Sequence, residues 1–205
     1  MKGAVAQLVS WLDRLNAAAG WLARWAVLLM LAIGIWNVIG RYLGSAIGVN
    51  LSSNGLIEAQ WYLFDLIFLL GLGWTLQKNG HVRVDVLQSR WSLRRRNRQE
   101  LNGILLLLLP FAFAVMALAI APALRSWSIG ELSPDPGGLP RTWVKSLIPV
   151  GFLLLGLQGI AEALRLRWTL RHPNATLNAS DLNAADLNAN ANSHQEQAND
   201  GGPSL

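Results

Sequence analysis

Apolar residues in this chain gather into four long runs instead of recurring at amphipathic spacing. The runs cover residues 21–40, 56–76, 101–121 and 143–164. Each has roughly the 20 residues that a helix needs to cross a hydrocarbon core of about 30 Å. Backbone groups in lipid must be bonded within their own segment, so each run is expected to be a helix. The pattern predicts an all-α membrane protein with a four-helix transmembrane domain over residues 20–170.

The two ends of the chain differ from these runs. Residues 1–19 place apolar side chains at helical spacing, namely Val5, Leu8, Val9, Leu12 and Leu15. Polar residues interrupt them, which is not typical of a signal peptide. We expect a helix that either lies in the membrane interface or simply extends the first span. Residues 171–205 are rich in Asn and Ala and poor in bulky side chains. Such a tail buries too little apolar area to offset the entropy of ordering, so we expect it to be disordered.

Positive charge is distributed unevenly between the two sides of the predicted domain. Thirteen of the seventeen Lys and Arg residues lie at the start of the chain, between the second and third runs, or after the fourth run. The other side has Arg41, Arg125, Arg141 and Lys145. Lys and Arg near helix ends resist translocation. We therefore expect an inner-membrane protein with both termini in the cytoplasm. This bias explains the basic composition without a nucleic-acid partner.

The densest positive charge lies between the second and third runs. Its arginines are Arg94, Arg95, Arg96 and Arg98. Each is worth about 1 kcal/mol near an anionic membrane surface, so we expect them to contact lipid headgroups.

Three polar residues of the second run share one helical face: Glu58, Tyr62 and Asp65. An acidic side chain at the centre of a span costs at least about 2.5 kcal/mol, so it should face protein and not lipid. One interpretation is a contact with another helix or subunit. An intrachain pair, for instance between Glu58 and Arg41, is the alternative. A third interpretation is an ion or proton relay, for which one isolated carboxylate is the main evidence.

The chain offers little for catalysis or cofactor binding. It has no Cys, and its three His residues lie outside the four runs. A bis-His haem in the membrane, a thiolate metal site and a Cys nucleophile are thereby excluded. We expect neither an enzyme, nor a cofactor, nor a metal site. In the third run, Pro110 is expected to kink the helix.

Two longer sequence patterns indicate a protein family more specifically than composition and charge do. Glu58-x-x-x-Tyr62 opens the second run and is followed by GLGWTLQKNGHVRVDVL at Gly71–Leu87 and an Arg-rich continuation. Later comes ELSPDPGGLPRTWVKSLIPVGFLLLGLQGIAEALR at Glu131–Arg165. Together, over roughly residues 20–168, they resemble the small permease subunit of tripartite ATP-independent periplasmic (TRAP) transporters. The HVRVDV segment, with His81, Arg83 and Asp85, is the most specific part of the likeness.

The resemblance implies four spans with cytoplasmic termini and two protein partners. One is a large membrane subunit that carries the substrate and Na⁺. The other is a soluble periplasmic binding protein that delivers the substrate, typically an organic acid anion. The small subunit would be a scaffold for the large one, and membrane lipids would surround it. His81, Arg83 and Asp85 receive no role beyond structure or headgroup contact.

Within this interpretation two contact surfaces are predicted. The large subunit would meet the face of the second run that carries Glu58, Tyr62 and Asp65. The loop that contains Glu131, Asp135 and Arg141 would help to dock the binding protein. Two other hypotheses stay open. The chain could be an independent homo-oligomeric transporter or channel in which Asp65 or Glu58 titrates, or a membrane anchor for a cytoplasmic enzyme.

Overall fold

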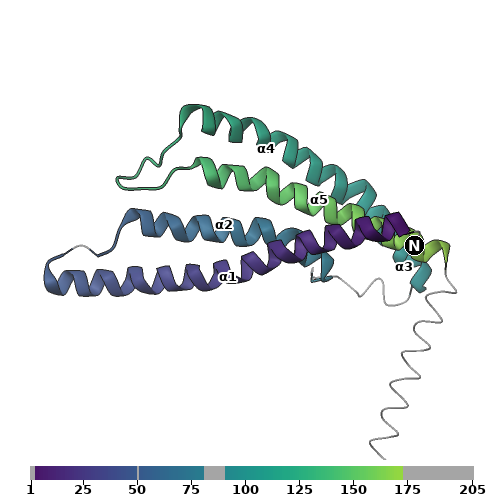
Figure 1. Cartoon of the computed structure of the whole chain (residues 1–205), viewed down its shortest axis with the longest axis horizontal. Helices are drawn as coiled ribbons and strands as arrows, with labels where there is room; N and C mark the ends of the chain where they lie inside the picture. The colour runs from purple at the N-terminus through teal and green to yellow at the C-terminus, as the bar shows by residue number, and fades with distance from the viewer. Residues whose placement is uncertain (1–2, 50, 81–90, 173–205) are drawn as a thin grey trace, which may run out of the picture.

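The computed structural model describes residues 3–49, 51–80 and 91–172, and this part of the chain is helical without any strand (Figure 1). Its elements are α1 (Gly3–Ile47), α2 (Asn54–Gln77), α3 (Leu93–Gly103), the π-helical turn η1 (Ile104–Leu108), α4 (Leu109–Ile129) and α5 (Thr142–Arg171). Among the described residues, four helical stretches are long and apolar enough to cross a membrane: α1, α2, the continuous stretch α3–η1–α4, and α5. The all-α class with four spans is confirmed.

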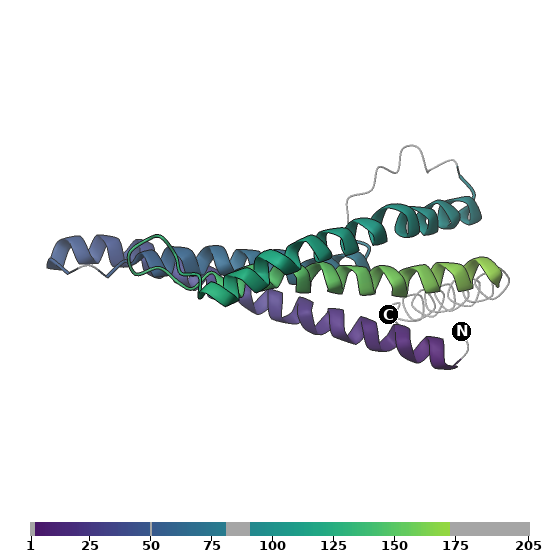
Figure 2. The same cartoon turned by 90° about the horizontal axis from the view of Figure 1, so that it is seen from above.

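The helices are arranged around α5, which packs against every other element. α1 also pairs with α2, whereas α2 and α4 make no direct backbone contact. Residues 48–49 and 51–53 after α1 and the connection 130–141 lie at one end of the bundle, which we call the loop end (Figure 1). The start of α1, α3 and the end of α5 lie at the other, which we call the terminal end (Figures 1 and 2).

α1 runs without a break through both the predicted first span and the segment ahead of it. Its 45 residues correspond to about 67 Å at 1.5 Å per residue, more than twice the thickness of a hydrocarbon core. Val9 and Leu12 are 4% and 3% exposed and pack with Ala161 of α5. The N-terminal segment is therefore helically continuous with the first predicted span, and it packs on α5.

Glycines allow the helices to approach closely. A Cβ on Gly73 of α2 would lie 1.9 Å from Asn16 Oδ1 of α1 and 3.2 Å from the carbonyl oxygen of Leu154 in α5. A Cβ on Gly151 of α5 would lie 2.7 Å from the Cβ of Leu69 in α2. Helices in lipid gain no hydrophobic free energy by associating, so close van der Waals contact through small residues holds them together.

The third span contains a change of helical register directly before Pro110. The Leu109 amide donates to the carbonyl of Ile104, five residues back, and Ile104–Leu108 form one π-helical turn. Proline has no amide hydrogen, and its ring crowds the carbonyl four residues earlier. A wider turn at this point relieves that crowding, as π-bulges do within α-helices.

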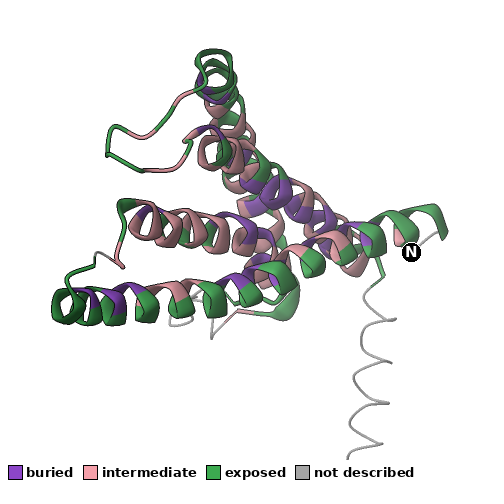
Figure 3. Cartoon of the chain, turned by 60° about the vertical axis from the view of Figure 1, so that its left-hand side comes forward, coloured by how far each residue is buried: buried purple, intermediate pink, exposed green. Residues whose placement is uncertain are grey.

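Buried residues concentrate along α5 and the helix faces turned toward it, and the outer faces of the bundle are exposed (Figure 3). The exposed residues are largely apolar and include Trp21, Trp25 and Trp36, each more than half exposed. An apolar outer surface of this kind suits contact with lipid or with another membrane protein.

Replacing Gly73 by Ala is expected to destabilise the bundle by about 1–3 kcal/mol, because overpacking at a tight contact forces neighbours apart. Gly71→Ala is the matched control on the same helix, because a Cβ there meets nothing within 4 Å. Alanine also has the higher helix propensity, so Gly71→Ala should be neutral or stabilising. Thermal unfolding of both variants in detergent tests this, and equal melting temperatures would contradict the packing described.

Candidate functional site

The connection between α4 and α5 folds onto the start of α2 at the loop end. The carboxylate of Glu58, which is 2% exposed, accepts hydrogen bonds from the Ser133 hydroxyl and, at 2.5 Å, from the Leu139 amide. The Tyr62 hydroxyl donates to the Leu139 carbonyl at 3.2 Å. Asn54 Nδ2 donates to the Pro136 carbonyl at 3.1 Å. Side chains of α2 thus hold the loop in one conformation.

The loop sequence allows this close contact. Gly130 ends α4 with φ 59°, in the left-handed region that favours glycine. A Cβ on Gly138 would lie 2.4 Å from the Ser133 Cβ and 2.7 Å from Glu58 Oε2. Only glycine at this position leaves room for the carboxylate to reach both of its donors.

Glu58 and Tyr62 are therefore engaged within the chain. The structure supports the intrachain alternative for Glu58, but its bonded partners are Ser133 and Leu139 and not the predicted Arg41. Ser133 and Leu139 were not predicted as partners of Glu58. A buried acid needs donors, but nothing in its local sequence tells which loop supplies them.

Asp65 differs from the two residues that precede it on the same face. It is the twelfth of the 24 residues of α2 and is partly buried. Its carboxylate makes no hydrogen bond or ion pair with the described part of the chain. Of the three residues predicted as one contact surface, Glu58 and Tyr62 thus bond the loop. Asp65 has no partner within the described chain.

The loop residues predicted to dock the binding protein differ in their contacts: Glu131 and Arg141 are bonded within the chain, whereas the Asp135 side chain is exposed. The Glu131 carboxylate pairs with Lys145 Nζ of α5 at 2.5 Å, and its carbonyl accepts from the Arg141 amide at 3.0 Å. The hydrogen bond from Lys145 is the main reason why the pKa of Glu131 lies below its usual value. The Asp135 side chain is exposed, and only its backbone bonds within the loop.

A second polar cluster joins α1, α2 and α5 near the terminal end. Asn16 and Gln158 have no exposed surface, and Asn16 Nδ2 donates to Gln158 Oε1 at 2.9 Å. Gln158 Nε2 donates to Asp13 Oδ1 at 3.0 Å, and Arg165 pairs with the other oxygen of Asp13. Gln77 of α2 donates to the Asp13 carbonyl at 3.1 Å. The cluster fixes the depth of α1 against α5.

Sequence reasoning missed this cluster as well. In the sequence, Asp13 and Asn16 interrupt an apolar pattern, and Gln158 lies within the fourth apolar run. An amide in the middle of an apolar run was the available signal, because such a group requires a partner in protein.

The basic segment is only partly described. Arg94, Arg95 and Arg98 of α3 are exposed, and Arg96 is partly buried. The Arg95 guanidinium lies 4.6 Å from the centre of the Trp91 ring, at cation–π distance. His81, Arg83 and Asp85 lie outside the described residues. Among the described residues, no group of three or more His, Asp or Glu side chains is placed to hold a metal ion.

Four helices that are long and apolar enough to cross a membrane define a multi-pass membrane protein. Residues 30–168 match the family described as tripartite ATP-independent periplasmic transporters, DctQ component. The match covers more than half of the chain, and the chain belongs to this family, which confirms the resemblance seen in its sequence. No curated protein matches the chain. The family is a transporter component and not an enzyme family, so the chain belongs in a transport complex.

Glu58→Ala is expected to lower the free energy of unfolding by about 1–3 kcal/mol, because the Ser133 hydroxyl and the Leu139 amide lose their acceptor. The loop should also become more sensitive to protease. Glu58→Gln keeps the shape and one acceptor oxygen, so a smaller loss is expected. Thermal unfolding and limited proteolysis in detergent measure both effects. A Glu58→Ala protein as stable and as resistant as the parent would show that the loop is held by other contacts.

Proposed function

We propose that this chain is the small membrane subunit of a TRAP-type secondary transporter. It holds the large transport subunit in the inner membrane during Na⁺-coupled uptake of an organic acid anion delivered by a periplasmic binding protein. The large subunit carries the substrate and Na⁺ sites, and the small subunit has neither catalytic activity nor a cofactor.

Two observations support this proposal: the chain belongs to the family, and buried polar residues of the bundle form hydrogen bonds within the chain. Glu58 is bonded at the loop end, and Asn16 and Gln158 are bonded near the terminal end, all within the chain. A substrate pathway needs polar groups that a solute can reach in turn. Buried groups already bonded to one another instead fix helices relative to each other. Such a bundle suits a rigid support for a subunit that moves.

The proposed orientation places the loop end in the periplasm and the terminal end in the cytoplasm. Thirteen of the seventeen Lys and Arg residues are then cytoplasmic. Arg94, Arg95 and Arg98, exposed on α3, are available to anionic headgroups on that side, with Arg96 beside them. For His81, Arg83 and Asp85 we propose structural or headgroup contact on the same side.

The loop that follows α4 is the proposed dock for the binding protein. It is held on α2 by Glu58 and Tyr62, so a partner meets a surface that needs little further ordering. It presents the exposed Asp135 carboxylate and Leu132, which is 67% exposed. Glu131 and Arg141 support the loop through the bonds described above.

Contact with the large subunit is assigned to the α2 face that carries Asp65. Glu58 and Tyr62 support this face indirectly, through the loop. The rival functions make different demands: an independent homo-oligomeric channel requires solute flux through the purified chain, and an enzyme anchor requires a cytoplasmic enzyme that co-purifies with it.

Reconstitution into liposomes distinguishes these functions. We expect uptake driven by a Na⁺ gradient only when this chain, the large subunit and the binding protein are all present. Vesicles with this chain alone should show no flux, because the proposed substrate and Na⁺ sites belong to the large subunit. Full uptake by the large subunit and binding protein without this chain would contradict the proposed scaffold, and flux through this chain alone would support the channel.

Asp135→Lys tests the dock without disturbing the loop, because the bonds of Asp135 within the loop are made by its backbone. We expect the binding-protein concentration for half-maximal uptake to rise several-fold, with an unchanged maximal rate. Reversal of a rim charge changes association more than chemistry, which is the reason for this expectation. Asp135→Asn should give a smaller rise, and both variants should melt like the parent. An unchanged half-maximal concentration would remove Asp135 from the dock.

A further inference from the structure

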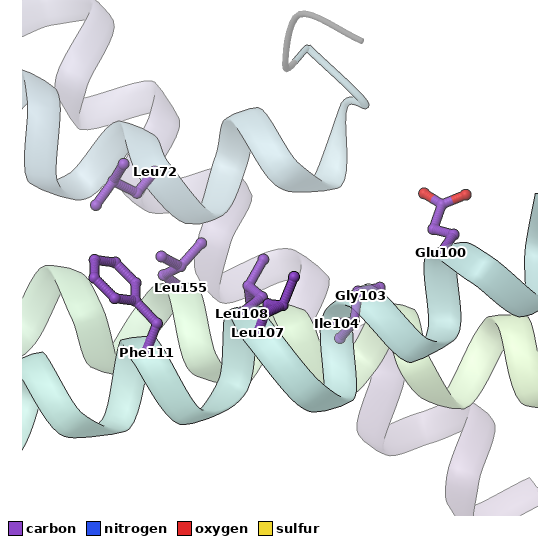
Figure 4. A pocket seen from close by; sticks show the side chains of 8 residues that line it. All are labelled: Leu72, Glu100, Gly103, Ile104, Leu107, Leu108, Phe111 and Leu155. Carbon is purple, nitrogen blue, oxygen red and sulfur yellow. The ribbon is translucent and has the colours of Figure 1, made fainter. Parts of the chain in front are cut away.

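An open groove runs between α2 and the third span, because both pack on α5 and not on each other. It has a volume of about 630 Å³ and is lined almost entirely by apolar side chains (Figure 4). Leu72 of α2 forms one wall, Leu107 and Phe111 belong to the other, and Leu155 of α5 lies at the floor. Glu100 stands at the end of the groove toward α3.

The π-helical turn contributes to the uncovered wall. Leu105, Leu106 and Leu107 follow one another in this turn, and their exposed fractions are 47%, 72% and 73%. Three consecutive residues of an α-helix point in directions 100° apart, so one of them usually turns toward the neighbouring helix. Here none is buried. Of the three, Leu107 lines the groove, and the wall that it forms is left for another molecule to cover.

Asp65 lies on the same face of α2 as the groove-lining Leu72. The two residues are seven apart, which is close to two helical turns, and Phe68 between them is 57% exposed. Asp65 has no bonding partner in the described part of the chain. A carboxylate inside a span costs at least about 2.5 kcal/mol, and a donor from outside the chain would remove that cost.

We propose that the groove receives a transmembrane helix of the large subunit and that this helix carries a basic or hydrogen-bond-donating side chain to Asp65. The inference rests on the proposed function and specifies the contact. A helix that carries one donor satisfies both the apolar walls and the carboxylate. A phospholipid acyl chain satisfies only the walls, because it carries no hydrogen-bond donor that could reach Asp65 in the middle of the span.

Two positions of almost equal exposure are suited to a photo-crosslinking residue. Leu107 is 73% exposed in the groove wall, and Leu118 is 76% exposed farther along the same continuous helix, outside the groove. A benzophenone amino acid is placed at either position, and the chain is co-expressed with the large subunit. After irradiation, we expect position 107 to give several-fold more adduct with the large subunit than position 118.

The other outcomes separate the two proposals. If the unmodified chain does not co-purify with the large subunit, the proposed function fails, and the inference fails with it. If the two subunits co-purify, three results overturn the groove contact alone: position 107 gives only a phospholipid adduct, it gives only a dimer of this chain, or it gives no more large-subunit adduct than position 118.

Asp65→Leu provides the second test. The isolated variant should melt at a higher temperature than the parent, because an unpaired acid is removed from the span. The same variant should retain about tenfold less large subunit, since loss of one partner of a buried charged bond weakens an interface by at least that factor. Asp65→Asn keeps an acceptor and should retain an intermediate amount.

Gln60→Leu is the matched control, because the Gln60 side chain bonds its own helix at Leu56 and lies against Gly34 of α1. It should leave retention of the large subunit unchanged. If Asp65→Leu retains as much large subunit as the parent, the donor to Asp65 does not exist and the proposal is overturned. A fall equal to that of Gln60→Leu would overturn it as well.

Discussion

A polar group inside a bilayer has no water to bond, and this constraint decides how the helices of the bundle are placed. Helices in lipid gain nothing from hiding apolar surface, so other contacts must set their depth and rotation. The pairing of Asn16 with Gln158 sets α1 against α5. Glu58 sets the start of α2 beneath the loop that leads into α5. Glycines then bring the backbones together between these two fixed points.

α5 is the element on which the two halves of the chain meet. α1 and α2 form one helical hairpin, the third span and α5 form another, and the contacts of α5 with both turn two hairpins into one body. Both polar clusters include α5 or the loop ahead of it. A support for a moving neighbour needs this kind of internal fixation, because a support that yields would absorb the displacement it should resist.

The number of spans could be predicted because it depends on average hydrophobicity over about 20 residues, which neighbours do not alter. The partners of the polar residues could not be predicted. Residues 1–19 were expected to be helical, and α1 does begin at Gly3, but nothing in the local sequence indicates that Asp13 pairs with Arg165 and Gln158. A single sequence shows that a polar residue interrupts a run, but it does not show which residue elsewhere bonds it.

For the candidate site, the residues that need partners could be predicted, but the partners themselves could not. The cost of acids in a span identified Glu58 and Asp65 as residues that need partners, and helical spacing placed them on one face. Spacing could not distinguish an acid satisfied inside the chain from one that is not. That distinction depends on the fold of the loop between α4 and α5, where Gly138 leaves space for the Glu58 carboxylate. The groove could not be predicted either, because it exists only where α2 and the third span pack on α5 and not on each other.

The bond between Ser133 and Glu58 joins residues 75 positions apart, and this separation has a consequence for biogenesis. At a synthesis rate of about 5–20 residues per second, the second helix is made roughly 4–15 s before its hydroxyl donor leaves the ribosome. During that interval the carboxylate must stay near the aqueous surface or be shielded by the insertion machinery. A nascent chain that stops before the second hairpin leaves this acid without the two donors that the finished fold supplies.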